Sequence, residues 1–249
     1  MLTRARIASN AVVPAGLRDL APLRNPRRML AWLLVPLLAA LAWLAPAALG
    51  RIGSLGESRL VGPRSPAPVG LVVALDVSGS FASYAAVRTR VLEEVVRWAP
   101  ANLRPDDTLT VLTFAGGADV LIDEVTMAEL ARTGPRLLAA GPAVDGTRIQ
   151  PLLHTAADHV TPGRTTTLVV VSDTVVSDLD RTAVDRQVRQ LDAATMTLIV
   201  PEGVRPTRDW ASVFDYEQVL ASSPEASGEI ALAIGRAIAH ATGQALQRR

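Results

Sequence analysis

The chain has 249 residues, of which 49% are hydrophobic and 20% charged, and its formal net charge at pH 7 is +1. This length and apolar content allow one domain of ordinary size with attached segments. The near-neutral charge gives no reason to expect nucleic-acid binding, and the lack of cysteine excludes disulfides, thiolate metal sites and thiol chemistry.

Residues 29–50 form an uncharged apolar stretch that, as a helix rising about 1.5 Å per residue, would span roughly 33 Å. Pro36 in its middle is tolerated better in a membrane helix than in a soluble one. The residues before it contain one acidic side chain, Asp19, and several basic ones: Arg4, Arg6, Arg18, Arg24, Arg27 and Arg28. The positive-inside rule therefore predicts a single-pass protein of the cell membrane, with a cytoplasmic tail 1–28, a transmembrane helix 29–50 and an extracytoplasmic remainder.

Two other interpretations of residues 29–50 remain open. The stretch could be a signal peptide cleaved at Ala45-Pro46-Ala47, although its apolar region is longer than usual for such peptides. It could also be a buried helix of a soluble domain, but it has no polar face. The next segment, 51–69, is rich in Gly, Pro and Ser and lacks periodicity, so we interpret it as a linker.

From residue 70 to 247, strand-like and helix-like segments alternate, which is typical of a sheet flanked by helices. Strands are expected at 71–75, 108–114, 118–122, 166–172, 195–200 and, weakly, 213–219. Helices are expected at 82–98, 126–140, 149–160, 182–193 and around 230–238, with an irregular loop at 201–212. Gly116-Gly117 would form a hairpin turn, so 118–122 should pair antiparallel. The pattern predicts an α/β fold with a doubly wound, mostly parallel sheet of Rossmann-like type.

The apolar run 71–75 ends in Asp76-x-Ser78-x-Ser80. A continuous apolar run of this length is typical of a strand buried on both faces, so this loop should lie at the carboxyl edge of the sheet. One carboxylate and two hydroxyls on alternate residues form a set of oxygen ligands that suits hard divalent cations. Thr147 lies in a loop before a predicted helix, and Asp173 ends a second apolar run.

This arrangement resembles the von Willebrand factor type A domain and its metal-ion-dependent adhesion site, over about residues 67 to 247. The resemblance implies that Asp76, Ser78, Ser80, Thr147 and Asp173 hold one Mg²⁺, or else Mn²⁺ or Ca²⁺. It also implies a module that binds proteins and is not an enzyme, with a position on the metal for an acidic residue of the partner. Neither nucleic acid nor a small-molecule substrate is implied. Thr174 departs from the family's pattern, because bacterial members usually have Gly after this Asp.

Three alternatives stay open. Asp76 and Ser78 could simply cap a helix and satisfy loop amides. The domain could be an accessory or assembly subunit that docks to an envelope complex without using a metal. A hydrolase would need a base near Ser78 or Ser80, but the chain's histidines, His154, His159 and His240, fall on predicted helices, and no Gly-x-Ser-x-Gly elbow occurs.

Overall fold

The structure is a computed structural model that describes residues 53–133, 146–176, 180–202, 204–206, 208–219 and 226–249. The predicted tail 1–28 and transmembrane helix 29–50 lie outside these ranges, so the expected topology stays a prediction. Within the described ranges, no helix combines the length and the apolar character needed to cross a membrane.

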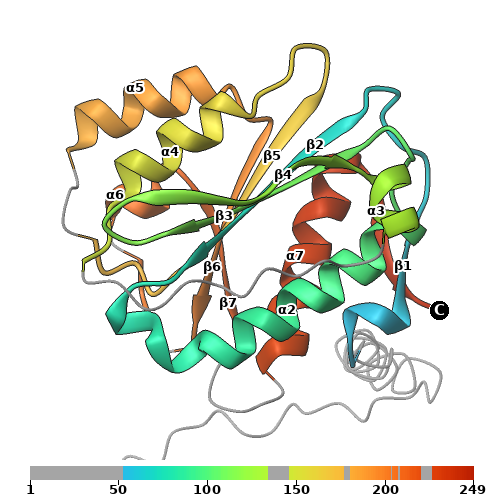
Figure 1. The fold of residues 1–249 in the computed structure, drawn as a ribbon, viewed down its shortest axis with the longest axis horizontal. Coiled ribbons are helices and arrows are strands. Elements are labelled where there is room, and N and C mark those ends of the chain that lie inside the picture. Colours follow the sequence, from blue (N-terminus) through green and yellow to red (C-terminus); the bar gives the residue numbers. More distant parts are fainter. Residues whose placement is uncertain (1–52, 134–145, 177–179, 203, 207, 220–225) are drawn as a thin grey trace, which may run out of the picture. The chain divides into compact units, whose positions relative to one another are not determined.

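The main sheet has six strands in the order β4-β3-β2-β5-β6-β7 (Figure 1). Their bounds are β2 Val69–Asp76, β3 Thr108–Phe114, β4 Ala118–Thr126, β5 Thr165–Val171, β6 Thr195–Pro201 and β7 Asp215–Val219. All neighbouring strands pair parallel except β3 and β4, which form the expected antiparallel hairpin. Because β2 lies at the centre with crossovers to both sides, the predicted mostly parallel, doubly wound α/β sheet is confirmed.

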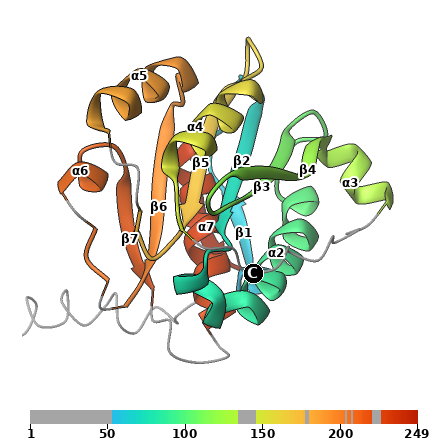
Figure 2. The same cartoon turned by 60° about the vertical axis from the view of Figure 1, so that its left-hand side comes forward.

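Helices cover both faces of this sheet, as Figure 2 shows from a second side. One face carries α2 (Ala85–Trp98) and α7 (Ala226–Thr242), and the other carries α4 (Ile149–Asp158), α5 (Arg181–Leu191) and the short α6 (Arg208–Ala211). Alternate side chains of each strand point to opposite faces. In β2, Leu71 and Val73 pack against α2 and α7, whereas Val72 and Ala74 pack in the core on the side of α4 and α5. Burial on both faces explains why β2 reads as a continuous apolar run.

Three predicted helical or loop segments need correction at their boundaries. The helix expected at 82–98 begins only at Ala85, because the 3₁₀-helix Gly79–Tyr84 precedes it. The helix expected at 126–140 is α3, Met127–Thr133, and the residues after it lie outside the described ranges. The expected irregular loop 201–212 contains α6. Short helical turns of this kind carry too few residues to show a helical period in the sequence.

The interpretation of residues 51–69 as a linker is wrong for much of its length. A 3₁₀-helix at Leu55–Glu57 leads into β1, Ser58–Val61, which pairs antiparallel with β8, Ala245–Arg248. The folded domain therefore includes residues well before 70, starting with the 3₁₀-helix at Leu55. The composition of 51–69 did not reveal this strand because its partner lies at the other end of the sequence.

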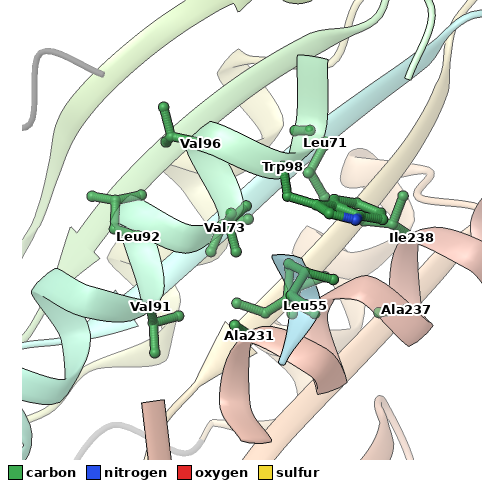
Figure 3. Packing of buried hydrophobic residues seen from close by; sticks show 14 of the residues in the cluster. Leu55, Leu71, Val73, Val91, Leu92, Val96, Trp98, Ala231, Ala237 and Ile238 are labelled. Carbon is green, nitrogen blue, oxygen red and sulfur yellow. The ribbon is translucent and has the colours of Figure 1, made fainter. Parts of the chain in front are cut away.

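Leu55 anchors this segment in the core. Its side chain is 0% exposed and lies against α2 and α7, among residues that include Trp98, Ala231 and Ile238 (Figure 3). A Cβ on Gly235 would come within 2.4 Å of Leu55 Cδ1, so α7 needs a glycine where Leu55 packs. The Trp98 Nε1–H group also donates to the Ser58 carbonyl at 2.9 Å. Packing and hydrogen bonding thus both fix β1 onto the C-terminal half of α2.

A buried carboxylate fixes the remainder of the segment. Asp107, 0% exposed at the start of β3, accepts from Arg64 Nη2 at 2.6 Å and from the Val69 amide at 2.8 Å. Its second oxygen accepts from the Arg104 amide at 2.7 Å. With three donors, the carboxylate is well satisfied without water, which is the condition under which a buried charge is tolerated.

We expect Leu55→Ala to lower the free energy of unfolding by about 2–5 kcal/mol, the range for leucine truncation in a packed core. Arg59→Ala is the matched control, because Arg59 lies in the same segment with an exposed side chain and should change stability by less than about 0.5 kcal/mol. Chemical denaturation of the full chain measures both values. Equal, small effects would mean that the segment 55–61 contributes little to the fold.

Candidate metal centre

The carboxylate of Asp76 forms the centre of the candidate site. Asp76 is the last residue of β2 and is 0% exposed. One of its oxygens, Oδ1, accepts from the Ser78 amide at 2.8 Å, and the other, Oδ2, accepts from Ser172 Oγ at 2.6 Å. The side chain therefore joins its own loop to the loop that follows the neighbouring strand β5.

The environment of Asp76 opposes its negative charge. Burial raises the pKa of Asp76 above its ordinary value of 3.8, hydrogen bonds from Ser172 and Ser78 lower it, and the charge of Asp173 raises it again. Burial is the largest of these influences, since a carboxylate loses its hydration inside the protein. A cation close to Asp76 would favour its charged form.

The two serine hydroxyls lie next to each other at the start of the 3₁₀-helix. Ser78 is 1% exposed, whereas Ser80 is exposed, and their Oγ atoms are 3.1 Å apart. Oxygens at this separation can bind the same small cation. Because Ser78 is buried beside the carboxylate and Ser80 is exposed, the two hydroxyls form a polar path from Asp76 to the surface.

Thr147 reaches the same edge of the sheet through the end of β3. The Val77 amide donates to the Phe114 carbonyl at 2.9 Å, and the Arg148 amide donates to the next carbonyl, that of Ala115, at 2.7 Å. These two bonds bring the Thr147 loop and the Asp76 loop to adjacent residues of one strand end. Thr147 itself is buried, at 3% exposed.

Asp173 lies in the turn that follows β5. Its side chain is half-buried, and its Oδ1 accepts from the Val175 amide at 3.1 Å. Between them, Thr174 has a φ of 63°, the left-handed conformation that glycine adopts most readily. A β-branched residue there stores about 1–3 kcal/mol of strain. This explains why glycine is the usual residue after the Asp, while the Thr174 amide still donates to Ser172 Oγ at 2.9 Å.

Two residues of the site were not predicted. Ser172 was seen only as the neighbour of Asp173, yet it is fully buried and holds the Asp76 carboxylate. Arg88 is 3% exposed, and its Nη1 donates to the Asp76 carbonyl at 2.9 Å and to the Phe81 carbonyl at 3.1 Å. A signal for Arg88 existed in the sequence, since it lies between Tyr84 and Val91 at the spacing of the apolar stripe of α2.

The donor chemistry of the site fits a hard divalent cation. Hydroxyl and carboxylate oxygens are the ligands that Mg²⁺, Mn²⁺ and Ca²⁺ prefer. In the part of the chain that the structure describes, no group of three or more His, Cys, Asp or Glu side chains could hold a metal. Any metal at this edge would therefore depend on serine and threonine oxygens beside Asp76 and Asp173.

The histidines lie on helices or at their ends. His154 is exposed on α4 and His240 is exposed on α7. His159, the residue that ends α4, has its Nδ1 3.4 Å from Asp123 Oδ1 of β4. None of the three lies in the strand-end loops that carry Ser78 and Ser80.

The fold, together with the Asp76 loop at its carboxyl edge, defines a von Willebrand factor type A (VWA) domain. Comparison with protein families supports this: the family described as "VWA domain containing CoxE-like protein" matches residues 46–213. The chain belongs to this family. No curated protein matches the sequence.

Several solved structures share the fold. An aerotolerance-related membrane protein from Bacteroides fragilis is 17% identical over 69% of this chain and 99% of that one, with a TM-score of 0.52. A von Willebrand factor type A protein from Catenulispora acidiphila is 14% identical over 74% of this chain, with a TM-score of 0.50. Proximal thread matrix protein 1 from the mussel byssus is 12% identical over 77% of this chain, with a TM-score of 0.53. This chain covers only 48% and 50% of the latter two, and all three comparisons bear on the fold alone.

The raised pKa of Asp76 gives a prediction about stability in the presence of a chelator. Between the ordinary pKa of 3.8 and the raised folded value, the native state holds a proton that the unfolded state has released, so stability falls as the pH rises through this window. Asp76→Asn removes this loss. We expect the stability of the variant relative to the wild type to increase as the pH rises above about 4, because only the wild type has the carboxyl group that loses its proton in the buried site.

Denaturant titrations at several pH values measure this difference. Asp158→Asn is the matched control, because it removes a carboxylate from the exposed side of α4. If the free-energy difference between Asp76→Asn and the wild type stayed constant with pH, burial of Asp76 would not govern its charge.

Proposed function

We propose that the protein is a membrane-anchored, extracytoplasmic module that binds a partner protein through a divalent cation. The observation that carries this proposal is the Asp76 carboxylate, buried between two strand-end loops with the hydroxyls of Ser78 and Ser80 beside it. The family supports the interaction role, since it is defined by a VWA domain. The role proposed is binding rather than catalysis.

Five side chains would hold the cation. Ser78, Ser80 and Thr147 offer neutral hydroxyl oxygens, while Asp76 and Asp173 contribute charge directly or through water. When bound, Mg²⁺ would supply a coordination position for a carboxylate from the partner. Because only two of the five ligands are anionic, they leave the cation attractive to a further acid.

The first described residues of the domain contact α2 away from the candidate site. The Gly56 amide donates to Glu94 Oε1 at 3.2 Å, so the entry segment lies beside the C-terminal half of α2. The Asp76 loop leads into the other end of this helix. The Bacteroides fragilis protein, described as a membrane protein, supports the proposed location at a membrane.

A second function is favoured by one specific observation. Both oxygens of Asp76 already accept hydrogen bonds from protein donors, Ser78 and Ser172, so the loop is satisfied in the absence of a metal. An accessory or assembly subunit that docks to an envelope complex through the same surface would need no more than this.

Metal binding is tested first on the full-length protein. Mg²⁺ that binds only the native state should raise the melting temperature, and at a concentration of about 100 times the dissociation constant it adds roughly 2.7 kcal/mol of stability. Ser80→Ala and Thr147→Ala should reduce this gain, because each removes one oxygen ligand.

Ser83→Ala is the control for these variants, since Ser83 is an exposed serine of the same 3₁₀-helix outside the proposed ligand set. It should respond to Mg²⁺ as the wild type does. A wild-type melting temperature that does not change with Mg²⁺, Mn²⁺ or Ca²⁺ would reject the metal site.

Partner binding is tested by crosslinking and capture from the cell envelope, with Mg²⁺ or with chelator. We expect capture to fall at least about tenfold with chelator and for Asp173→Ala, because the partner's acid would lose its cation. Glu129→Gln, which changes an exposed carboxylate on α3, should capture normally. Equal capture under all conditions would support docking without the metal instead.

A further inference from the structure

Arg88 is a charged side chain in an apolar place. It lies on α2 at 3% exposure, on the face that buries Val91 and Leu92 in the core. Burial lowers the pKa of Arg88, and the charge of Asp76 opposes that effect. Charged side chains are rarely buried to this degree unless specific partners hold them. The hydrogen bonds of Arg88 should therefore indicate its structural role.

These contacts join the two ends of one loop. A single nitrogen, Nη1, donates to the carbonyl of Asp76 at 2.9 Å and to that of Phe81 at 3.1 Å. Between these two carbonyls lie Ser78 and Ser80, the hydroxyl ligands of the proposed site. Arg88 thus closes the Asp76–Phe81 loop from its buried side, where it can hold the two backbone carbonyls at a fixed separation.

Arg88 makes these contacts at a cost to the fold. Its Nε is buried and has no hydrogen-bond partner among the described residues. An unsatisfied buried donor is unfavourable, and an apolar side chain of similar volume would avoid that cost. Phe81 also stacks on Tyr84 with ring centroids 4.4 Å apart, so apolar packing already holds the far end of the loop. Core packing alone therefore gives no reason for an arginine at this position.

We propose that Arg88 is a positioning residue that keeps the Asp76–Phe81 loop in its ligand-binding shape when no metal is bound. A loop that is ordered beforehand loses less conformational freedom on binding, so affinity rises without any new contact to the ligand. The part of this inference that concerns metal affinity rests on the proposed function, whereas the ordering of the free loop does not.

The test compares Arg88→Met and Arg88→Lys with the wild type, using full-length protein. Hydrogen exchange of the amides of residues 77–81 is first measured with chelator. Arg88→Met, which keeps an apolar stem, should speed this exchange at least about tenfold, the effect of losing about 1.4 kcal/mol of local stability. Arg88→Lys retains an ammonium donor, so its exchange rate should lie between those of the wild type and Arg88→Met. Arg90→Met, an exposed arginine two residues further on, should exchange like the wild type.

Mg²⁺ affinity is then measured by calorimetry on the same proteins. Arg88→Met should bind about tenfold more weakly than the wild type, with partial recovery in Arg88→Lys. Unchanged loop exchange in a folded Arg88→Met would overturn the inference, and so would tighter Mg²⁺ binding, which would mean that Arg88 mainly repels the cation. If neither variant folded, Arg88 would serve the whole fold, and the inference would also be wrong. If Arg88→Met speeds loop exchange but the wild type binds no Mg²⁺, the proposed function is wrong and the inference about loop ordering stands.

Discussion

The hydrogen bond between Ser172 Oγ and the buried Asp76 carboxylate joins the two central strands at the edge where the candidate site lies. Asp76 ends β2 and Ser172 follows β5, so one side chain sets the distance between two loops that are 96 residues apart. The other groups are placed relative to this bond: the Ser78 amide on the same carboxylate, Arg88 on the Asp76 carbonyl, and the Thr174 amide on Ser172. A buried carboxylate is unfavourable for folding unless donors satisfy it, and the Ser78 amide and Ser172 Oγ do so here.

Much of this edge could be predicted from the sequence because its signals are local. A strand buried on both faces shows as an apolar run, and the polar residues that end it follow directly in the chain. The runs before Asp76 and Asp173 therefore predicted both the strands and the loops, and β2 and β5 are indeed neighbours in the sheet. The hairpin of β3 and β4 could be predicted from Gly116-Gly117 for the same reason, although β4 continues to Thr126, beyond the expected end at 122.

The features that were missed depend on residues far apart in the sequence. The strand β1 is only four residues long and forms because β8 pairs with it and Leu55, just before it, fills the space beside Gly235. A Gly- and Pro-rich composition describes only the local chain, so it suggested a linker. Ser172 looks like any serine after a strand until Asp76 is placed opposite. Arg88 differs, since a charge within an apolar stripe was visible, but its partners are backbone carbonyls, which no sequence pattern identifies.

The two ends of α2 serve the fold in different ways. At its C-terminal end, Trp98 and Leu55 are buried in apolar surroundings, and Trp98 Nε1 is satisfied by the Ser58 carbonyl, so packing there stabilises the domain. At its N-terminal end, the buried groups are the charges of Asp76 and Arg88, with one donor of Arg88 left unsatisfied. Buried charge of this kind contributes little net stability, because desolvation offsets the attraction. Since the domain's stability comes largely from apolar packing elsewhere, replacing the polar residues of the candidate site should alter folding less than replacing Leu55 or Trp98 would.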